Sequence, residues 1–138
     1  MFTLISGHKL KLMQAKLSDQ ELFRLIDRAV HKERLYTNPK LQRQDIMRRF
    51  GLRRQHLNAI LNRYAYGQGF PGYINSIRLN EAERLMKEKP EMTITAIAQS
   101  VGLSLPNFRI QFRNRYGYNP AEYRHSLEVT TNKTNKSI

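Results

Sequence analysis

Two stretches of the chain carry amide and guanidinium side chains at helical spacing, and such groups hydrogen-bond to base edges and phosphates of nucleic acids. In the first stretch, about residues 53–64, the apolar Leu57, Ile60 and Leu61 define one buried face of a helix. The side chains left exposed are Arg53, Arg54, Gln55, Asn58, Ala59, Asn62 and Arg63, with His56 near the edge. Gln and Asn can hold adenine through paired hydrogen bonds, and Arg prefers guanine or phosphate. This stretch therefore predicts a helix that can read a base sequence.

The second stretch, about residues 105–116, has Phe108 and Phe112 on its buried face. Its exposed residues are Asn107, Arg109, Ile110, Arg113 and Asn114. The apolar Ile110 can touch only a thymine methyl group or nothing. We therefore expect the first stretch to supply most of the sequence information, and the second to contact mainly the phosphate backbone, through Arg109, Arg113 and Arg115.

The two stretches belong to a pattern that is written twice, with a constant offset of 51 residues. Its matching positions are Ile46 and Ile97, Gly51 and Gly102, Leu57 and Phe108, and Leu61 and Phe112. In each copy one apolar-periodic helix stops at a glycine and a second begins a few residues later. This arrangement predicts two helix-turn-helix motifs, whose second helices enter the DNA major groove in proteins of this kind.

The rest of the chain also predicts helices. Ser18 and Glu21 form a capping box at the start of a helix from about Asp19 to Arg34, and the first motif's leading helix follows at 42–50. A glycine-rich turn at 67–72 precedes a long helix from Tyr73 to Lys89, and Pro120 starts a short last helix. No segment shows sustained strand alternation, so we expect an all-α fold of about seven helices. The expected parts are a flexible N-terminal segment or linker stub (1–17), a first subdomain (18–72), a linker helix (73–89), a second subdomain (90–126) and a disordered tail (127–138).

Charge favours a polyanionic partner. The 138 residues include 24 Lys and Arg against 11 Asp and Glu, a formal net charge of +13. No acidic residue occurs at 46–80 or at 92–121, the stretches that hold the two copies of the pattern. This placement predicts a nucleic-acid surface rather than a generic basic one.

Other functional classes lack their signatures in this sequence. There is no cysteine, which excludes disulfides and thiolate zinc sites and agrees with a reducing cytosol. The four histidines are far apart, and no Gly-rich phosphate loop or nucleophile-elbow motif occurs. The apolar residues 1–5 are too few to span a membrane. We therefore expect no enzymatic activity, no metal and no cofactor.

Several short motifs make the chain resemble the DNA-binding domain of AraC/XylS-type transcription regulators over about residues 41–124. They are Gly51-Leu52, Phe70-x-x-Tyr73-Ile74-Asn75-x-x-Arg78-Leu79, Ile94-x-x-Ile97-Ala98-x-x-Val101-Gly102, Phe108-x-x-x-Phe112 and Gly117-x-x-Pro120-x-x-Tyr123-Arg124. The resemblance implies seven helices, with two helix-turn-helix units joined by a linker helix and recognition helices in successive major-groove segments. A linker of about 17 residues spans roughly 25 Å, which suits that spacing.

The resemblance also implies residue roles and partners. Gln55, Asn58 and Ala59 occupy the base-facing stripe, whereas Ile110 stands where the family often has a polar or basic reader. The turn from Gly102 to Phe108 is about one residue shorter than is usual in the family. Implied partners are double-stranded DNA and RNA polymerase, in the bacterial cytoplasm at the nucleoid.

Some alternatives stay open from the sequence. The chain could bind RNA instead of DNA, or could serve mainly in protein contact. The helix at 19–34 could pack on the first motif, which we favour, or form a dimer interface. Most of the aromatic residues are expected in the core rather than stacked on bases. The chain could be a complete short regulator, or the DNA-binding end of one with a separate sensor or dimerisation domain.

Overall fold

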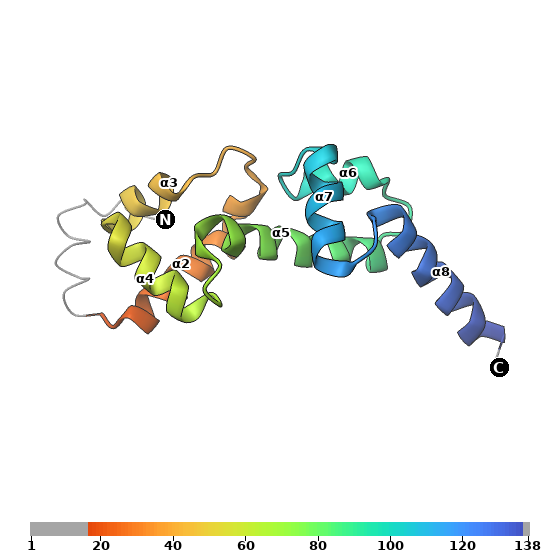
Figure 1. Ribbon diagram of the computed structural model, residues 1–138, viewed down its shortest axis with the longest axis horizontal. Helices are drawn as coiled ribbons and strands as arrows, with labels where there is room; N and C mark the ends of the chain where they lie inside the picture. The colour runs from red at the N-terminus through yellow and green to blue at the C-terminus, as the bar shows by residue number, and fades with distance from the viewer. Residues whose placement is uncertain (1–16, 137–138) are drawn as a thin grey trace. The chain divides into compact units, whose positions relative to one another are not determined.

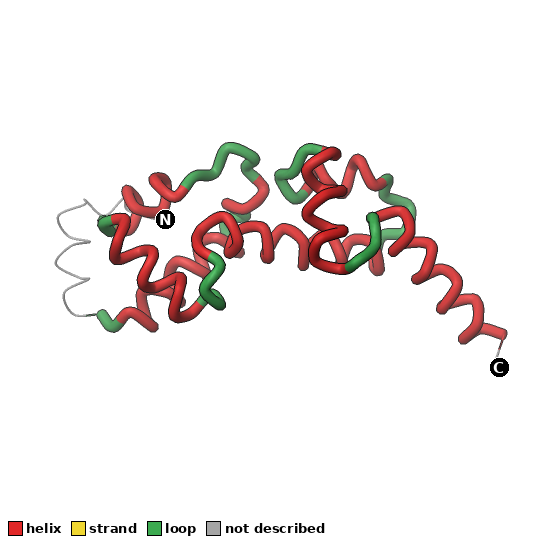
Figure 2. The backbone as a smooth tube through the Cα atoms, viewed as in Figure 1, coloured by secondary structure: helices red, strands yellow, loops and turns green. Residues whose placement is uncertain are grey.

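The structure is a computed structural model that describes residues 17–136, with side chains described to Thr130, and in this part it consists of helices joined by loops (Figures 1 and 2). Over the described range there are seven α-helices, α2 to α8, and one short 3-10 helix, η1. The all-α prediction is confirmed. The expected N-terminal segment lies, apart from Leu17, outside the described residues. The chain divides into two compact units between Ile74 and Asn75, inside α5.

Unit 1 contains α2 (Asp19–Lys32), η1 (Leu35–Thr37), α3 (Arg43–Phe50) and α4 (Arg54–Tyr64). The predicted capping box starts α2: Ser18 Oγ accepts a hydrogen bond from the Glu21 amide at 3.1 Å, and the Glu21 carboxylate accepts one from the Ser18 amide at 3.1 Å. The apolar face of α2, which includes the buried Leu22 and Ile26, packs against α4. This packing agrees with the favoured role of the helix.

Unit 2 contains α6 (Ile94–Ser100), α7 (Leu105–Tyr116) and α8 (Pro120–Lys136) together with most of α5 (Gly69–Glu88). The hydroxyl groups of Thr93 and Ser104 cap α6 and α7 by accepting backbone amide bonds three residues later. Phe108 and Phe112 are fully buried at the centre of this unit's core. Side chains from α5, α6 and α8 surround them.

Helix α5 begins four residues earlier than the predicted Tyr73. It includes Pro71, because the first amides of a helix need no intrahelical acceptor and a proline costs little there. Gly72 also suits this start, since a Cβ atom on it would lie 2.4 Å from the Cβ of Gln68. The predicted glycine-rich turn is therefore shorter, and its second half is helical.

Helix α8 is longer than predicted. It continues to Lys136, through residues expected to form a disordered tail. Leu127 packs against the core of unit 2, and the hydroxyls of Ser126 and Thr130 donate to carbonyls of the preceding turn. No Gly or Pro follows Pro120 to stop the helix. Within residues 17–136, no helix has both the length and the apolarity needed to span a membrane.

Candidate nucleic-acid interface

The two helix-turn-helix motifs share one backbone frame, residue for residue. The Leu52 amide donates to Met47 O at 2.9 Å, and the Leu103 amide donates to Ala98 O at 3.0 Å, each closing the end of the first helix. Gly51 and Gly102 have positive φ angles of 64° and 84° at the turn, a conformation that favours glycine. All three pairs of positions keep the offset of 51. The repeat in the sequence therefore corresponds to a repeat of local structure.

The buried side chains of the frame are also paired between the motifs. Ile46, Leu57 and Leu61 in unit 1 are at most 1% exposed, and so are their partners in unit 2, Ile97, Phe108 and Phe112. Each second helix is therefore held by equivalent apolar contacts. What differs between the motifs lies on the opposite faces.

In α4 the exposed face carries amides at its centre. With about 100° between successive residues, Gln55 and Ala59 point within about 30° of the direction opposite to the buried Leu57, Ile60 and Leu61. Asn62 lies beside them, and these three outward residues are exposed. Arg53, Arg54 and Arg63 are exposed as well, and the Arg63 guanidinium lies 5.5 Å from the ring centre of Tyr64. The side chains predicted to read bases at these positions thus share one exposed helix face.

Two of the predicted residues lie at the sides of α4. The Nε2 atom of His56 is 2.8 Å from Asp19 Oδ1, so this ring is tied to the first turn of α2. Asn58 is half-buried, and its Oδ1 has no hydrogen-bond partner among the described residues. These two side chains are less available to a ligand than Gln55 or Asn62. Sequence periodicity placed His56 near the edge of the exposed face, but it grouped Asn58 with the exposed residues.

In α7 the centre of the exposed face is apolar. Ile110 lies two residues from both Phe108 and Phe112, which places it about 180° around the helix from the core. Its exposed fraction is 59%. The predicted residues Asn107, Arg109, Arg113 and Asn114 are all exposed around it.

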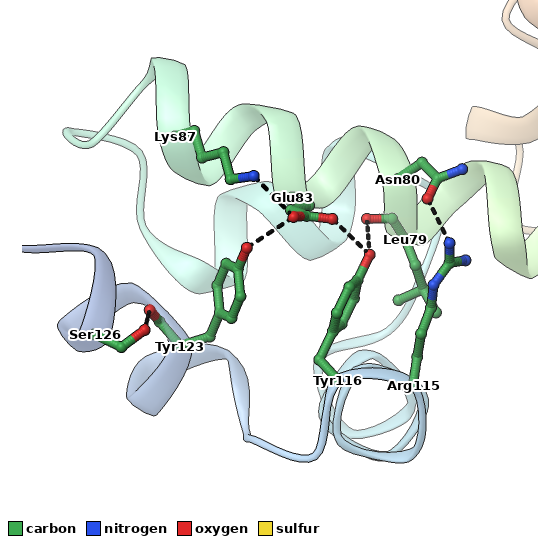
Figure 3. A network of polar contacts seen from close by, with 8 residues as sticks. All are labelled: Leu79, Asn80, Glu83, Lys87, Arg115, Tyr116, Tyr123 and Ser126. Carbon is green, nitrogen blue, oxygen red and sulfur yellow. Dashed lines mark hydrogen bonds and ion pairs between the residues drawn. The ribbon is translucent and has the colours of Figure 1, made fainter. Parts of the chain in front are cut away.

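Arg115 is held inside unit 2, although sequence analysis grouped it with the arginines that face phosphates. Its Nη2 donates to Asn80 Oδ1 at 2.7 Å (Figure 3), and its Nη1 donates to Ser76 O at 3.3 Å. The guanidinium also lies 5.4 Å from the ring centre of Tyr116. The residue thus fastens the C-terminal end of α7 to α5, because both acceptors are on that helix.

Glu83 forms the centre of a second set of contacts that hold α7. Its carboxylate accepts hydrogen bonds from Tyr116 at 2.9 Å, from Tyr123 at 2.8 Å and from Lys87 at 2.9 Å (Figure 3). These hydrogen bonds lower the pKa of Glu83, and the bond from Lys87 has the largest effect. Burial and the bond to Glu83 raise the pKa of Tyr116 to about 12. Sequence periodicity predicted these tyrosines as core residues but not their shared carboxylate.

Not every arginine in the acid-free stretches is available for a ligand. Arg49 forms an ion pair with Glu33 in unit 1, with Nη1 2.7 Å from Oε1. Arg78 is buried, and desolvation lowers the pKa of its guanidinium. In contrast, Arg48, Arg54 and Arg113 are exposed. The cationic surface is consequently smaller than the sequence count indicated, but it still surrounds both exposed helix faces.

No group of three or more His, Cys, Asp or Glu residues suited to a metal ion occurs in the described part of the chain. The exposed chemistry of α4 and α7 is mainly hydrogen bonding and positive charge, with the apolar Ala59 on α4 and the apolar Pro106 and Ile110 on α7.

A protein-family model described as a helix-turn-helix domain matches residues 46–126, which include both motifs and α5. Two solved structures are similar in fold. The C-terminal domain of the two-component response regulator yesN from Fusobacterium nucleatum aligns with a TM-score of 0.66 and 23% identity, covering 75% of this chain and 97% of that one. The DNA-binding domain of AdpA, a global transcriptional factor solved in complex with a target DNA, aligns with a TM-score of 0.67 and 17% identity, covering 79% and 94%. No curated protein matches the chain significantly.

Proposed function

The chain belongs to the AraC/XylS-type family of helix-turn-helix DNA-binding transcription regulators, and we propose that it reads double-stranded DNA in a sequence-specific manner, with α4 and α7 in successive major-groove segments. The observation that carries this proposal is the outward face of α4. Gln55 and Asn62 are exposed there, opposite a fully buried frame, with arginines on both sides and no acidic residue in the helix. Amides in such a position can pair with adenine edges, while the arginines contact guanine or phosphate.

The second unit supports a weaker reading role. Around Ile110, α7 presents Arg109, Arg113 and two asparagines, a set that contacts phosphates well but offers fewer paired hydrogen bonds to bases. Helix α5 runs from one unit into the other as 20 residues, about 30 Å at 1.5 Å per residue.

Selection of bound sites from a pool of random duplexes tests the proposal. We expect enrichment of one consensus with two half-sites about 10 base pairs apart, the stronger one beneath unit 1. Absence of enrichment would overturn sequence-specific binding, and a single half-site would overturn the use of both helices. The alternative of RNA binding is tested by competition between the selected duplex and structured RNA at equal salt, because RNA is read through shape and unpaired bases.

A pair of arginine variants tests the electrostatic part. Arg54→Ala should weaken binding to every duplex alike and reduce the slope of log affinity against log salt by about 1. Arg24→Ala removes an exposed arginine from α2, outside the proposed surface, and serves as the control. Equal slopes for the two variants would contradict the assignment of Arg54.

Family membership also leads us to propose RNA polymerase as a second partner, with a sensor or dimerisation domain in a longer form of the protein. Binding to purified polymerase, measured with and without the selected duplex, tests the first of these. Binding that persists without the duplex would support a direct contact with the polymerase. Binding only in the presence of the duplex would mean that the chain and the polymerase are held together by the DNA.

A further inference from the structure

One exposed side chain on α7 is a large apolar group among mostly polar neighbours. Ile110 is at the apex of the outward face of α7, and its neighbours on that face are Asn107, Arg113 and Asn114. An isolated, exposed isoleucine is common on protein surfaces. This one, however, lies on the side of α7 opposite the core, the side that would face a bound duplex.

We propose that Ile110 is a specificity-determining residue that packs against the C5-methyl group of a thymine. The proposal rests on the proposed function, since it requires α7 to enter the major groove. The thymine methyl is the apolar group that unmodified base pairs present in that groove, and an apolar side chain is its natural contact.

The register of the repeat supports this assignment. The offset of 51 pairs Ile110 with Ala59, which lies near the centre of the outward face of α4. Both motifs thus have an apolar residue near the centre of the outward face, next to Gln55 in α4 and to Pro106 in α7. The isoleucine extends further from its helix than the alanine, so it can reach a base edge while the arginines beside it stay at the phosphates.

The charge around Ile110 argues against a protein partner for this residue. Docking of a protein would require a contiguous apolar patch, whereas the apolar surface here is limited to Ile110 and the exposed Pro106 one turn earlier, with guanidinium and amide groups on the other sides. No acidic residue occurs from 92 to 121, which includes all of α7. A polyanion with an apolar group in its groove fits this surface better.

The test deletes one methyl group from the DNA and, separately, the side chain from the protein. Each thymine of the half-site beneath unit 2 is replaced in turn by deoxyuridine in the selected duplex, and affinity is measured for the wild type and for Ile110→Ala. We expect one replacement to weaken wild-type binding about fourfold, the factor that corresponds to one buried methyl group. Ile110→Ala should weaken binding to the thymine duplex by at least as much and should not respond to that replacement.

The truncation is not expected to impair folding, because Ile110 is exposed, and thermal unfolding checks this. Leu25→Ala, which truncates an apolar side chain that is 43% exposed on α2, is the matched control and should respond to deoxyuridine as the wild type does. The proposal fails if the half-site contains no thymine, if every replacement is tolerated, or if Ile110→Ala responds as strongly as the wild type. In each of those cases sequence-specific binding by the wild type still stands, whereas loss of all duplex selectivity would overturn the proposed function itself.

Discussion

Units 1 and 2 have the same helix-turn-helix frame but hold and use their second helices differently. In unit 1, α4 presents amides outward and is tied at its first turn by His56 to Asp19. In unit 2, α7 presents an isoleucine and is tied at its last turn by Tyr116 and Arg115 to α5. The residue type at a buried position is restricted by the volume that it must fill. At an exposed position it is restricted only by contacts with a ligand or with neighbouring side chains. A duplicated frame therefore does not imply a duplicated reading surface.

The largest expected effect comes from truncating buried side chains of the frame that units 1 and 2 share. Leu61→Ala and Phe112→Ala truncate equivalent, fully buried side chains, and we expect losses of about 2–5 and 3–5 kcal/mol in the free energy of unfolding. Denaturant titration followed by circular dichroism measures both. Gln20→Ala, at an exposed site, should stay within about 0.5 kcal/mol of the wild type. A near-neutral result in either unit would mean that the frames are not equivalent.

The next effect concerns the reading surfaces. Gln55→Ala should cost about 1–3 kcal/mol of discrimination at one base pair beneath unit 1, since it removes a paired contact to a base. Arg113→Ala should instead lower affinity for selected and random duplexes by similar factors, because a phosphate contact carries no sequence information. Fluorescence anisotropy with single-base-pair variants of the selected site distinguishes the two patterns, with Gln20→Ala as the amide control. Greater loss of selectivity for Arg113→Ala would reverse the assigned roles.

A third test uses pH to probe how α7 is held. The pKa of Glu83 is lowered in the folded state, so its hydrogen bonds stabilise the fold above the unfolded-state pKa of about 4.5 and are lost as pH falls through the folded-state pKa. Glu83→Gln should cost on the order of 1–2 kcal/mol at pH 7, and the difference from the wild type should shrink below pH 4. Denaturation across pH 3–7 measures this.

Glu88→Gln is the control for that series, because its carboxylate takes part in a solvent-exposed ion pair with Arg84, and exposed ion pairs contribute little to stability. A constant difference between Glu83→Gln and the wild type at every pH would show that the ionised carboxylate does not matter.

The smallest expected effect concerns helix starts. Ser104 caps α7, and Ser104→Ala should cost about 1 kcal/mol. The equivalent position in unit 1 is Arg53, whose side chain makes no capping bond, so Arg53→Ser should add about 0.5–1 kcal/mol of stability while it weakens DNA binding. Thermal unfolding together with affinity for a random duplex follows both changes. Equal signs for the two stability effects would contradict this difference between the units.

Local features of the fold were predictable from the sequence, because they depend on neighbours in the chain. The Ser18 capping box and the glycine at each turn both occur where the sequence predicted them. Errors arose at two element ends. The turn predicted at 67–72 includes Pro71, which lies in the first turn of α5, and the tail predicted from residue 127 continues α8 to Lys136.

The candidate site was predictable in its helices and less so in its individual residues. Periodicity placed Gln55, Asn62 and Ile110 outward, and the structure has them exposed. It could not anticipate that His56 would meet Asp19, that Arg115 would meet Asn80 or that Asn58 would be half-buried. Those features depend on residues that are far apart in the chain and that only folding brings together.

The amino-acid sequence by itself determined the duplicated helix-turn-helix frame, the positive charge of its two outward faces and the apolar residue at the centre of the second. These properties follow from the periodicity and composition of the sequence, which do not depend on how distant parts of the chain pack together. Only the tertiary structure decided which arginines and amides remain available to DNA and which of them hold the helices in place. The reason is physical: pairing across helices depends on distances of a few ångströms that sequence spacing does not encode.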